Sequence, residues 1–210
     1  MLTLQVVLAF FSVSVLLALA PGPDNVFVLV HAAQHGVRAG LLVVLGLCSG
    51  LLFHTAAVAL GLAALLATSA LAFTVLKTVG ALYLLWLAWL SWRAPAGPLQ
   101  GQADAEGETL GPWQTYGRGV LMNISNPKVA IFFLAFLPQF VDPALGPVQW
   151  QIAQLGAVFG LATLLTFGSI AALAGRFGQR LRESAGAQQT LNRLAAVVFA
   201  GLALRLVWLS

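Results

Sequence analysis

Charged side chains are scarce in this chain: Asp, Glu, Lys and Arg together make up 8% of its 210 residues. A soluble domain carries roughly 25%, and the mean hydropathy here is +0.93. The composition predicts an all-α integral membrane protein. Nearly the whole length is needed to cross a bilayer several times, so a separate soluble enzyme domain is excluded.

Cysteine is almost absent, and the residue groupings typical of enzymes are missing. Cys48 is the only cysteine, which excludes an internal disulfide or a two-thiol relay. His31, His35 and His54 have no carboxylate or thiolate at ligand spacing, so we expect neither a metal site nor a cofactor. No nucleophile, base and acid grouping is evident, and an enzyme is not expected. The chain has a net charge of +4, but its basic residues lie between the apolar runs. They therefore indicate orientation in a membrane and not nucleic-acid binding.

Long apolar runs are what the sequence does have. A spanning helix needs about 20 apolar residues, and six runs approach or exceed that length. They are Leu4–Ala20, Leu41–Leu66, Leu71–Trp92, Val120–Pro138, Ile152–Ala174 and Leu194–Leu209. The sequence therefore predicts a polytopic membrane protein with six transmembrane helices.

The basic residues between these runs predict the orientation, because cytoplasmic loops retain Lys and Arg. With six spans, the loops after the first, third and fifth helices lie on one side, and they hold all seven basic loop residues. These are Arg38, Arg93, Arg118, Arg176, Arg180, Arg182 and Arg193. We therefore expect these loops in the cytoplasm, both termini outside, and the region 94–117, rich in Gly, Pro and Gln, as a cytoplasmic linker.

This linker divides the single membrane domain into residues 1–93 and 118–210, each with three spans. Two odd-numbered halves enter the membrane from opposite sides, which predicts a 3+3 inverted repeat. The first helix of each half carries a proline break, Pro21-Gly22-Pro23-Asp24-Asn25 in one and Asn126-Pro127-Lys128 in the other. Aligning Pro23 with Pro127 places a charge after the proline in both. The alternative is that these prolines are ordinary loop ends.

Hydrocarbon tolerates neither free backbone groups nor charge, so the breaks mark the expected site. Asp24 and Lys128 have the two charges that a zwitterion needs, and they either clasp the ends of an amino acid or form a static ion pair. Asn25, Asn123 and Asn126 are the expected polar partners in substrate binding, or else structural caps.

Histidine is the side chain that ordinarily titrates near neutrality. His54 lies inside the second apolar run and, with Asp24, is the candidate for proton coupling. A hydrogen-bonded histidine at a helix contact is the alternative. His31 and His35 lie beside Arg38, where ordinary interfacial solvation is expected.

Several of these segments together resemble the LysE/RhtB family of amino-acid exporters. They are the PGPDN segment at 21–25, Gly80–Leu85, Asn126–Lys128, Phe132-Phe133 and Pro138–Phe140. The resemblance implies export of a small amino acid or derivative, similar to homoserine, threonine or leucine, by proton antiport or membrane potential. It also implies the bacterial inner membrane, with substrate, protons and lipid as partners. An assembly of several copies is compatible with it. The alternatives are an ion or metal carrier on the same six-helix plan and, less favoured, a membrane enzyme.

Overall fold

The computed structural model describes residues 2–20, 22–68, 70–94, 110–183 and 185–208, and these are almost entirely helical. The α-helices are α1 (Leu4–Leu19), α2 (Pro23–His35), α3 (Val37–Thr68), α4 (Ala70–Arg93), α5 (Pro112–Ser125), α6 (Pro127–Ile131), α7 (Val148–Glu183) and α8 (Ala185–Trp208). A π-helix, Phe132–Phe136, and two 3-10 turns, Leu137–Phe140 and Pro143–Leu145, join α6 to α7. Pro21 and most of the predicted linker lie outside the described residues.

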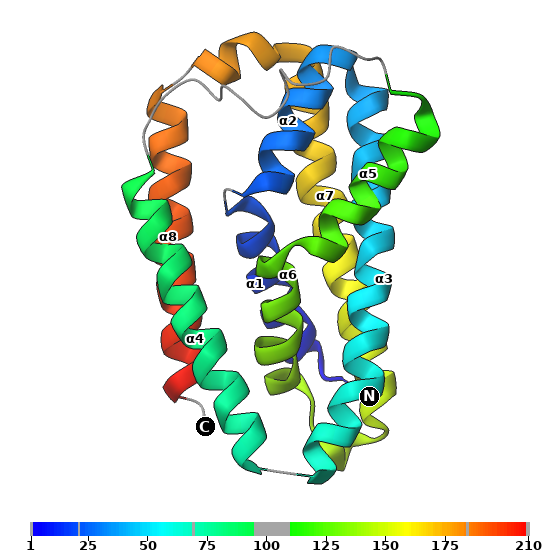
Figure 1. Ribbon diagram of the computed structural model, residues 1–210, viewed down its shortest axis with the longest axis vertical. Helices are drawn as coiled ribbons and strands as arrows, with labels where there is room; N and C mark the ends of the chain where they lie inside the picture. Colours follow the sequence, from blue (N-terminus) through cyan, green and yellow to red (C-terminus); the bar gives the residue numbers. More distant parts are fainter. Residues whose placement is uncertain (1, 21, 69, 95–109, 184, 209–210) are drawn as a thin grey trace.

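The described helices are those of a multi-pass membrane protein. Helices α3, α4 and α7 each contain a stretch long and apolar enough to cross a bilayer. Two bent pairs add a span each if each pair is counted as one: α1 with α2, bent by 65°, and α5 with Pro127–Phe140, bent by 49°. Helix α8 runs alongside α4 (Figure 1). The length and composition of the described helices thus give three to five spans, and the sixth stays a prediction.

A helix follows the first break directly, as a broken first helix requires, but two expected boundaries differ in the structure. The residues between Ala20 and Leu41 were expected to connect two spans, yet they form α2 and the start of α3. Proline is favoured in the first turn of a helix because its φ is already helical and it lacks an N–H. Helix α5 likewise begins at Pro112, inside the predicted linker, where Gly111 N donates to Gln114 Oε1 at 2.9 Å.

The helix contacts divide into a main body and a helix pair. In the body, α3 packs on α5 and α7, and α7 also packs on α1 and α2. Helices α3 and α5 touch backbone to backbone, since a Cβ added at Gly46 would lie 2.2 Å from Tyr116 O. Only small residues allow this approach. The α4–α8 pair joins the body through α1 and the π-helix.

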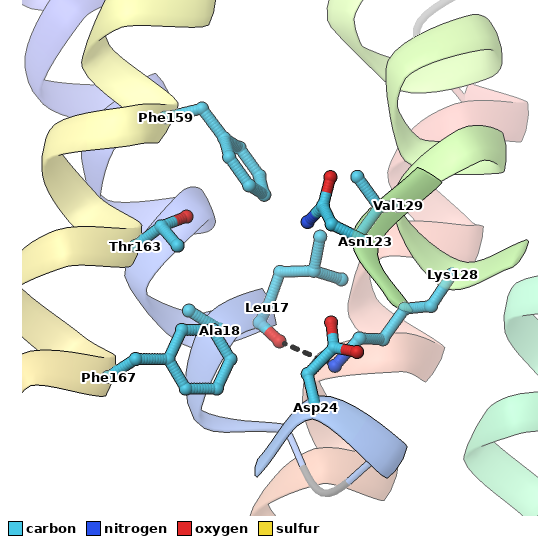
Figure 2. A pocket seen from close by; sticks show the side chains of 9 residues that line it. All are labelled: Leu17, Ala18, Asp24, Asn123, Lys128, Val129, Phe159, Thr163 and Phe167. Atoms are coloured by element: carbon cyan, nitrogen blue, oxygen red, sulfur yellow. Dashed lines mark hydrogen bonds between the residues drawn. The ribbon is translucent and has the colours of Figure 1, made fainter. Parts of the chain in front are cut away.

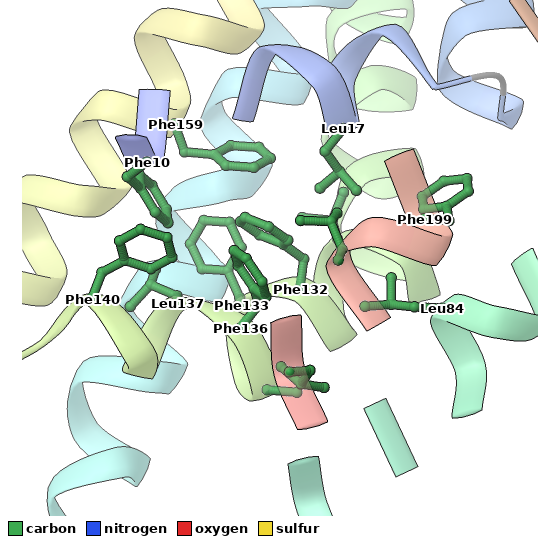
Figure 3. Close-up of a cluster of buried hydrophobic side chains, with 14 of the residues drawn as sticks. Phe10, Leu17, Leu84, Phe132, Phe133, Phe136, Leu137, Phe140, Phe159 and Phe199 are labelled. Carbon is green, nitrogen blue, oxygen red and sulfur yellow. The ribbon is translucent and has the colours of Figure 1, made fainter. Parts of the chain in front are cut away.

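An aromatic cluster fills the core beside the second break (Figure 3). Its members come from α1, the π-helix, the following 3-10 turn and α7, and they are Phe10, Phe132, Phe133, Phe136, Phe140 and Phe159. Ring centroids of neighbouring members lie 5.0 to 6.5 Å apart, the range in which aromatic pairs attract. The cluster fixes the position of Phe159, which also lines the candidate site.

Candidate functional site

Each proline break places the start of a short helix inside the protein. Helix α2 starts at Pro23 after Gly22, and α6 starts at Pro127 after Asn126. In both, a charged residue follows the proline directly, Asp24 in α2 and Lys128 in α6, and both side chains are buried. The two breaks therefore have the same local design with charges of opposite sign.

Lys128 satisfies the backbone carbonyls that the first break releases. Its Nζ donates to Ala20 O at 3.0 Å and to Leu17 O at 3.3 Å, at the C-terminal end of α1. A cation at a helix C-terminus is stabilised by the partial negative charge of the free carbonyls. Asn25 Nδ2 donates to a further carbonyl, Ala18 O, at 2.7 Å. A Cβ at Gly22 would lie 3.1 Å from Lys128 Nζ, so glycine leaves room for the ammonium.

Asp24 makes the reciprocal contact, from the first break to the second. Its Oδ2 accepts a hydrogen bond from Asn126 Nδ2 at 2.6 Å, and Asn126 Oδ1 accepts one from Lys128 N at 3.0 Å. Asn126 thus caps α6 and holds Asp24 at once. Asp24 and Lys128 also attract each other electrostatically. The hydrogen bonds of Lys128 Nζ nevertheless go to backbone carbonyls, so the pair is not a simple two-residue ion pair.

A small cavity opens between the two breaks and α7 (Figure 2). Its lining residues are Leu17, Ala18, Asp24, Asn123, Lys128, Val129, Phe159, Thr163 and Phe167. Its volume is about 10 Å³ for a water-sized sphere, close to room for one water molecule. Any larger ligand needs the walls to move apart.

Three oxygens of the lining residues are buried without a hydrogen-bond partner: Asp24 Oδ1, Asn123 Oδ1 and Thr163 Oγ1. Most buried polar groups in proteins are paired, and an unpaired one costs roughly 1–3 kcal/mol. The free oxygen of Asp24 and the Lys128 ammonium in the same cavity wall suit a ligand that has both a cationic and an anionic end. Among the described residues, no group of three or more His, Cys, Asp or Glu side chains is placed to hold a metal ion.

Comparison with known proteins gives the family. A family model described as "LysE type translocator" matches residues 15–210, most of the chain. The chain belongs to the LysE family. The resemblance inferred from the sequence motifs is thereby confirmed, and a member of this translocator family is a transporter and not an enzyme.

Several LysE relatives have names that state what they export. A homoserine/homoserine lactone efflux protein of Salmonella typhimurium is 34% identical over 157 residues, 75% of this chain and 72% of the relative. A leucine efflux protein of Klebsiella pneumoniae is 30% identical, with 94% and 92% covered. A cysteine/O-acetylserine efflux protein of Salmonella choleraesuis is 31% identical, with 95% and 96% covered. No solved structure matches this LysE protein.

Four of the five residues expected to bind substrate meet at this LysE site. Asp24, Asn123 and Lys128 line the cavity, and Asn126 joins Asp24 to the start of α6. Asn25 is part of the same junction, but its amide is used on Ala18 O and it does not line the cavity. Their role in binding stays a prediction.

His54 lies one residue away from the cavity wall. It is buried, and its Nε2 is 3.0 Å from Asn123 O, the carbonyl that also accepts the Asn126 N–H at the end of α5. The ring also packs near Phe133, with 5.7 Å between centroids. His54 therefore contacts the backbone of a cavity residue without lining the cavity.

His31 corrects an expectation, because it is buried and not solvated at an interface. Its ring stacks on Phe27 at 5.3 Å and lies 4.5 Å from the ring of His35. Arg118 of α5 lies over the Phe27 ring, 4.9 Å from its centroid. The packing of α2 on α3, α5 and α7 is the reason, because it places this segment inside the body of the protein.

Sequence reasoning missed the α7 wall of the site. Phe159, Thr163 and Phe167 lie at helical spacing on one face of α7 and point toward the two breaks (Figure 2). They occur in the apolar run Ile152–Ala174, where nothing distinguishes one phenylalanine from another. The one available signal was the hydroxyl of Thr163 inside an apolar run, and such a hydroxyl usually bonds to its own helix.

Proposed function

We propose that this protein exports a small neutral amino acid or a close derivative, similar to homoserine, threonine or leucine, from the cytoplasm. The observation that carries the proposal is the cavity between the two helix breaks, where a buried carboxylate, a buried ammonium and unpaired oxygens meet. The efflux proteins among the relatives support the direction and the substrate class.

The opposite charges of Asp24 and Lys128 indicate where each end of the substrate binds. Asp24 Oδ1 is free to accept from the α-ammonium, because Asn126 occupies only Oδ2. The Lys128 ammonium, with one N–H beyond the two that it donates to carbonyls, attracts the α-carboxylate. Both groups remain hydrogen-bonded to the protein when the substrate leaves, so neither charge is left buried without a partner.

The size of the cavity supports alternating access. An amino acid does not fit in space for about one water molecule, so the walls must open toward one side at a time. The two breaks are where such a motion costs least, because the helical hydrogen bonds are already interrupted there.

The pattern of helix contacts supports the 3+3 inverted repeat. When the first half is exchanged for the second, the α3–α5 contact maps onto the contact of α7 with α1 and α2. The α3–α7 and α4–α8 contacts map onto themselves. With each broken helix taken as one unit, the contact of α8 with the first broken helix maps onto the contact of α4 with the second. In this arrangement α8 is the sixth span.

The ends of the helices support an orientation with both termini outside, in the bacterial inner membrane. Both termini lie toward the end of the molecule where α3 meets α4, and α3 begins and α4 ends at the opposite end (Figure 1). Arg38 and Arg93 lie at that opposite end, which the distribution of basic residues assigns to the cytoplasm.

Proton antiport needs a group that binds a proton and senses the substrate. His54 contacts the backbone of Asn123 and Asp24 faces the cavity, so these two are the proposed coupling groups. A carrier of metal ions is less favoured, because the Lys128 ammonium in the cavity wall repels a cation.

Uptake into inverted vesicles tests the proposal. A panel of radiolabelled amino acids is offered with and without an imposed proton gradient, and we expect gradient-stimulated accumulation of at least one small neutral member. Asp24→Asn abolishes it, while Asp142→Asn retains it, because Asp142 is an exposed carboxylate that caps a 3-10 turn away from the cavity. No accumulation of any member by the wild-type protein would sink the exporter proposal.

A further inference from the structure

One buried hydroxyl in the cavity wall does not bond to its own helix. Among the described residues, eight helical hydroxyls, one of them on α7 itself, donate to the carbonyl four residues earlier: Ser12, Ser14, Ser49, Thr55, Thr78, Ser125, Ser169 and Thr190. This local bond is the usual way for a helix to satisfy a hydroxyl away from water. Thr163 is 2% exposed, and its Oγ1 has no hydrogen-bond partner. Packing on α7 therefore leaves this hydroxyl unpaired.

The hydroxyl points into the cavity toward a second polar group. Figure 2 shows Thr163 on α7 and the amide of Asn123 on the opposite wall. Asn123 is also 2% exposed; its Nδ2 lies on the side that faces α7, and its unpaired Oδ1 lies against Gly50 of α3. The walls around them are apolar, formed by Leu17, Phe159 and Val129. A polar pair inside an apolar wall, separate from the Asp24 and Lys128 charges, is a place for the side chain of the ligand.

We propose that Thr163 and Asn123 recognise a hydroxyl on the substrate side chain, so the transporter selects short hydroxylated amino acids over apolar ones of the same shape. This inference rests on the proposed function. A hydroxyl both donates and accepts, so it pairs with the Thr163 hydroxyl and the Asn123 amide together. A methyl group in the same place leaves both buried groups unpaired, and sites of this kind reject such analogues strongly.

Thr163 is therefore a specificity-determining residue, and two isosteric pairs of amino acids test it. Threonine and valine differ by hydroxyl against methyl, and so do homoserine and norvaline. The measurement is kcat/KM for uptake of each member into inverted vesicles. For the wild-type protein we expect the hydroxylated member of at least one pair to be favoured by roughly tenfold or more.

Three variants isolate the hydroxyl of Thr163. Thr163→Val keeps the shape and loses the hydroxyl, and it reduces the preference to about one while apolar uptake persists. Thr163→Ser keeps the hydroxyl and retains the preference. Thr166→Val is the control: Thr166 is buried on the same helix but does not line the cavity, and its loss leaves the preference unchanged.

The outcomes separate this inference from the exporter proposal. Equal wild-type uptake within both pairs overturns the role of Thr163 and leaves the exporter standing, and so does a full preference retained by Thr163→Val. Uptake of no amino acid overturns both. If Thr163→Val does not insert, thermal stabilisation of the purified wild-type protein decides: homoserine or threonine raises Tm more than its apolar isostere, and equal shifts contradict the inference.

Discussion

Removing the ammonium of Lys128 while leaving the Asp24 carboxylate in place measures how strongly the two helix breaks are coupled. In Lys128→Met the carbonyls of Leu17 and Ala20 lose their donor, and Asp24 keeps a single hydrogen bond, from Asn126. Methionine preserves most of the buried stem. The change therefore removes the charge with little loss of packing.

The magnitude follows from the lost contacts. Two hydrogen bonds to a charged donor are worth about 3–6 kcal/mol together, and relief of the ammonium's desolvation offsets part of this. The carboxylate left behind adds to the loss, so we expect a net destabilisation of about 3 kcal/mol. For a chain of this length that corresponds to roughly 6–12 °C in Tm.

Asp24→Asn completes the double-mutant cycle. Asparagine removes the uncompensated charge, so the double variant loses less stability than the two single changes added together, by about 1–3 kcal/mol. Thermal unfolding of the purified variants in detergent, followed by tryptophan fluorescence, measures all four proteins. Each single variant also loses transport while still inserting. Single losses that add within about 0.5 kcal/mol would refute the coupling.

The helix contact and the coupling group give two further predictions. Gly46→Ala lowers the free energy of unfolding by at least about 2 kcal/mol, because the added Cβ clashes with Tyr116 O. Gly160→Ala is the control: its Cβ meets no atom within 4 Å, so the variant is neutral or more stable by up to about 1 kcal/mol. Equal Tm values for the two variants would contradict the close contact of α3 with α5. His54→Gln retains a donor for Asn123 O but cannot titrate, so uptake persists and its stimulation by a proton gradient disappears. Undiminished stimulation excludes His54 as the coupling group.

Much of the site was visible in the sequence because it breaks rules that lipid imposes. A proline and a charge inside an apolar run are costly in hydrocarbon, so Asp24, Pro23, Pro127 and Lys128 stood out without any structure. The positions of the breaks, and the conclusion that this is a membrane protein, follow from the same cost of polar groups in hydrocarbon. What the sequence misjudged was the extent of the helices around the first break: the first apolar run was expected to end at Ala20 and the second to begin at Leu41, whereas α2 fills 23–35 and α3 begins at Val37.

The remaining parts of the site had no local signal. Phe159 and Phe167 are ordinary residues of an apolar helix, and only the packing of α7 against both breaks brings them to the cavity. His31 looked solvated beside Arg38, but it stacks on Phe27 one turn earlier in α2, and tertiary packing places Arg118 of α5 over the Phe27 ring.

The sequence by itself determined that this chain crosses a membrane, where its helices break and which charged residues lie at the breaks. Prolines and charges are costly inside an apolar helix in hydrocarbon, so the few that occur can be recognised in the sequence. Tertiary structure decided what those charges do: Lys128 caps the end of α1, and Asp24 holds the start of α6 through Asn126. It also decided that the hydroxyl of Thr163 faces the cavity unpaired. The contacts of Lys128 and Asp24 each join residues more than 100 positions apart, and no local pattern specifies such a meeting.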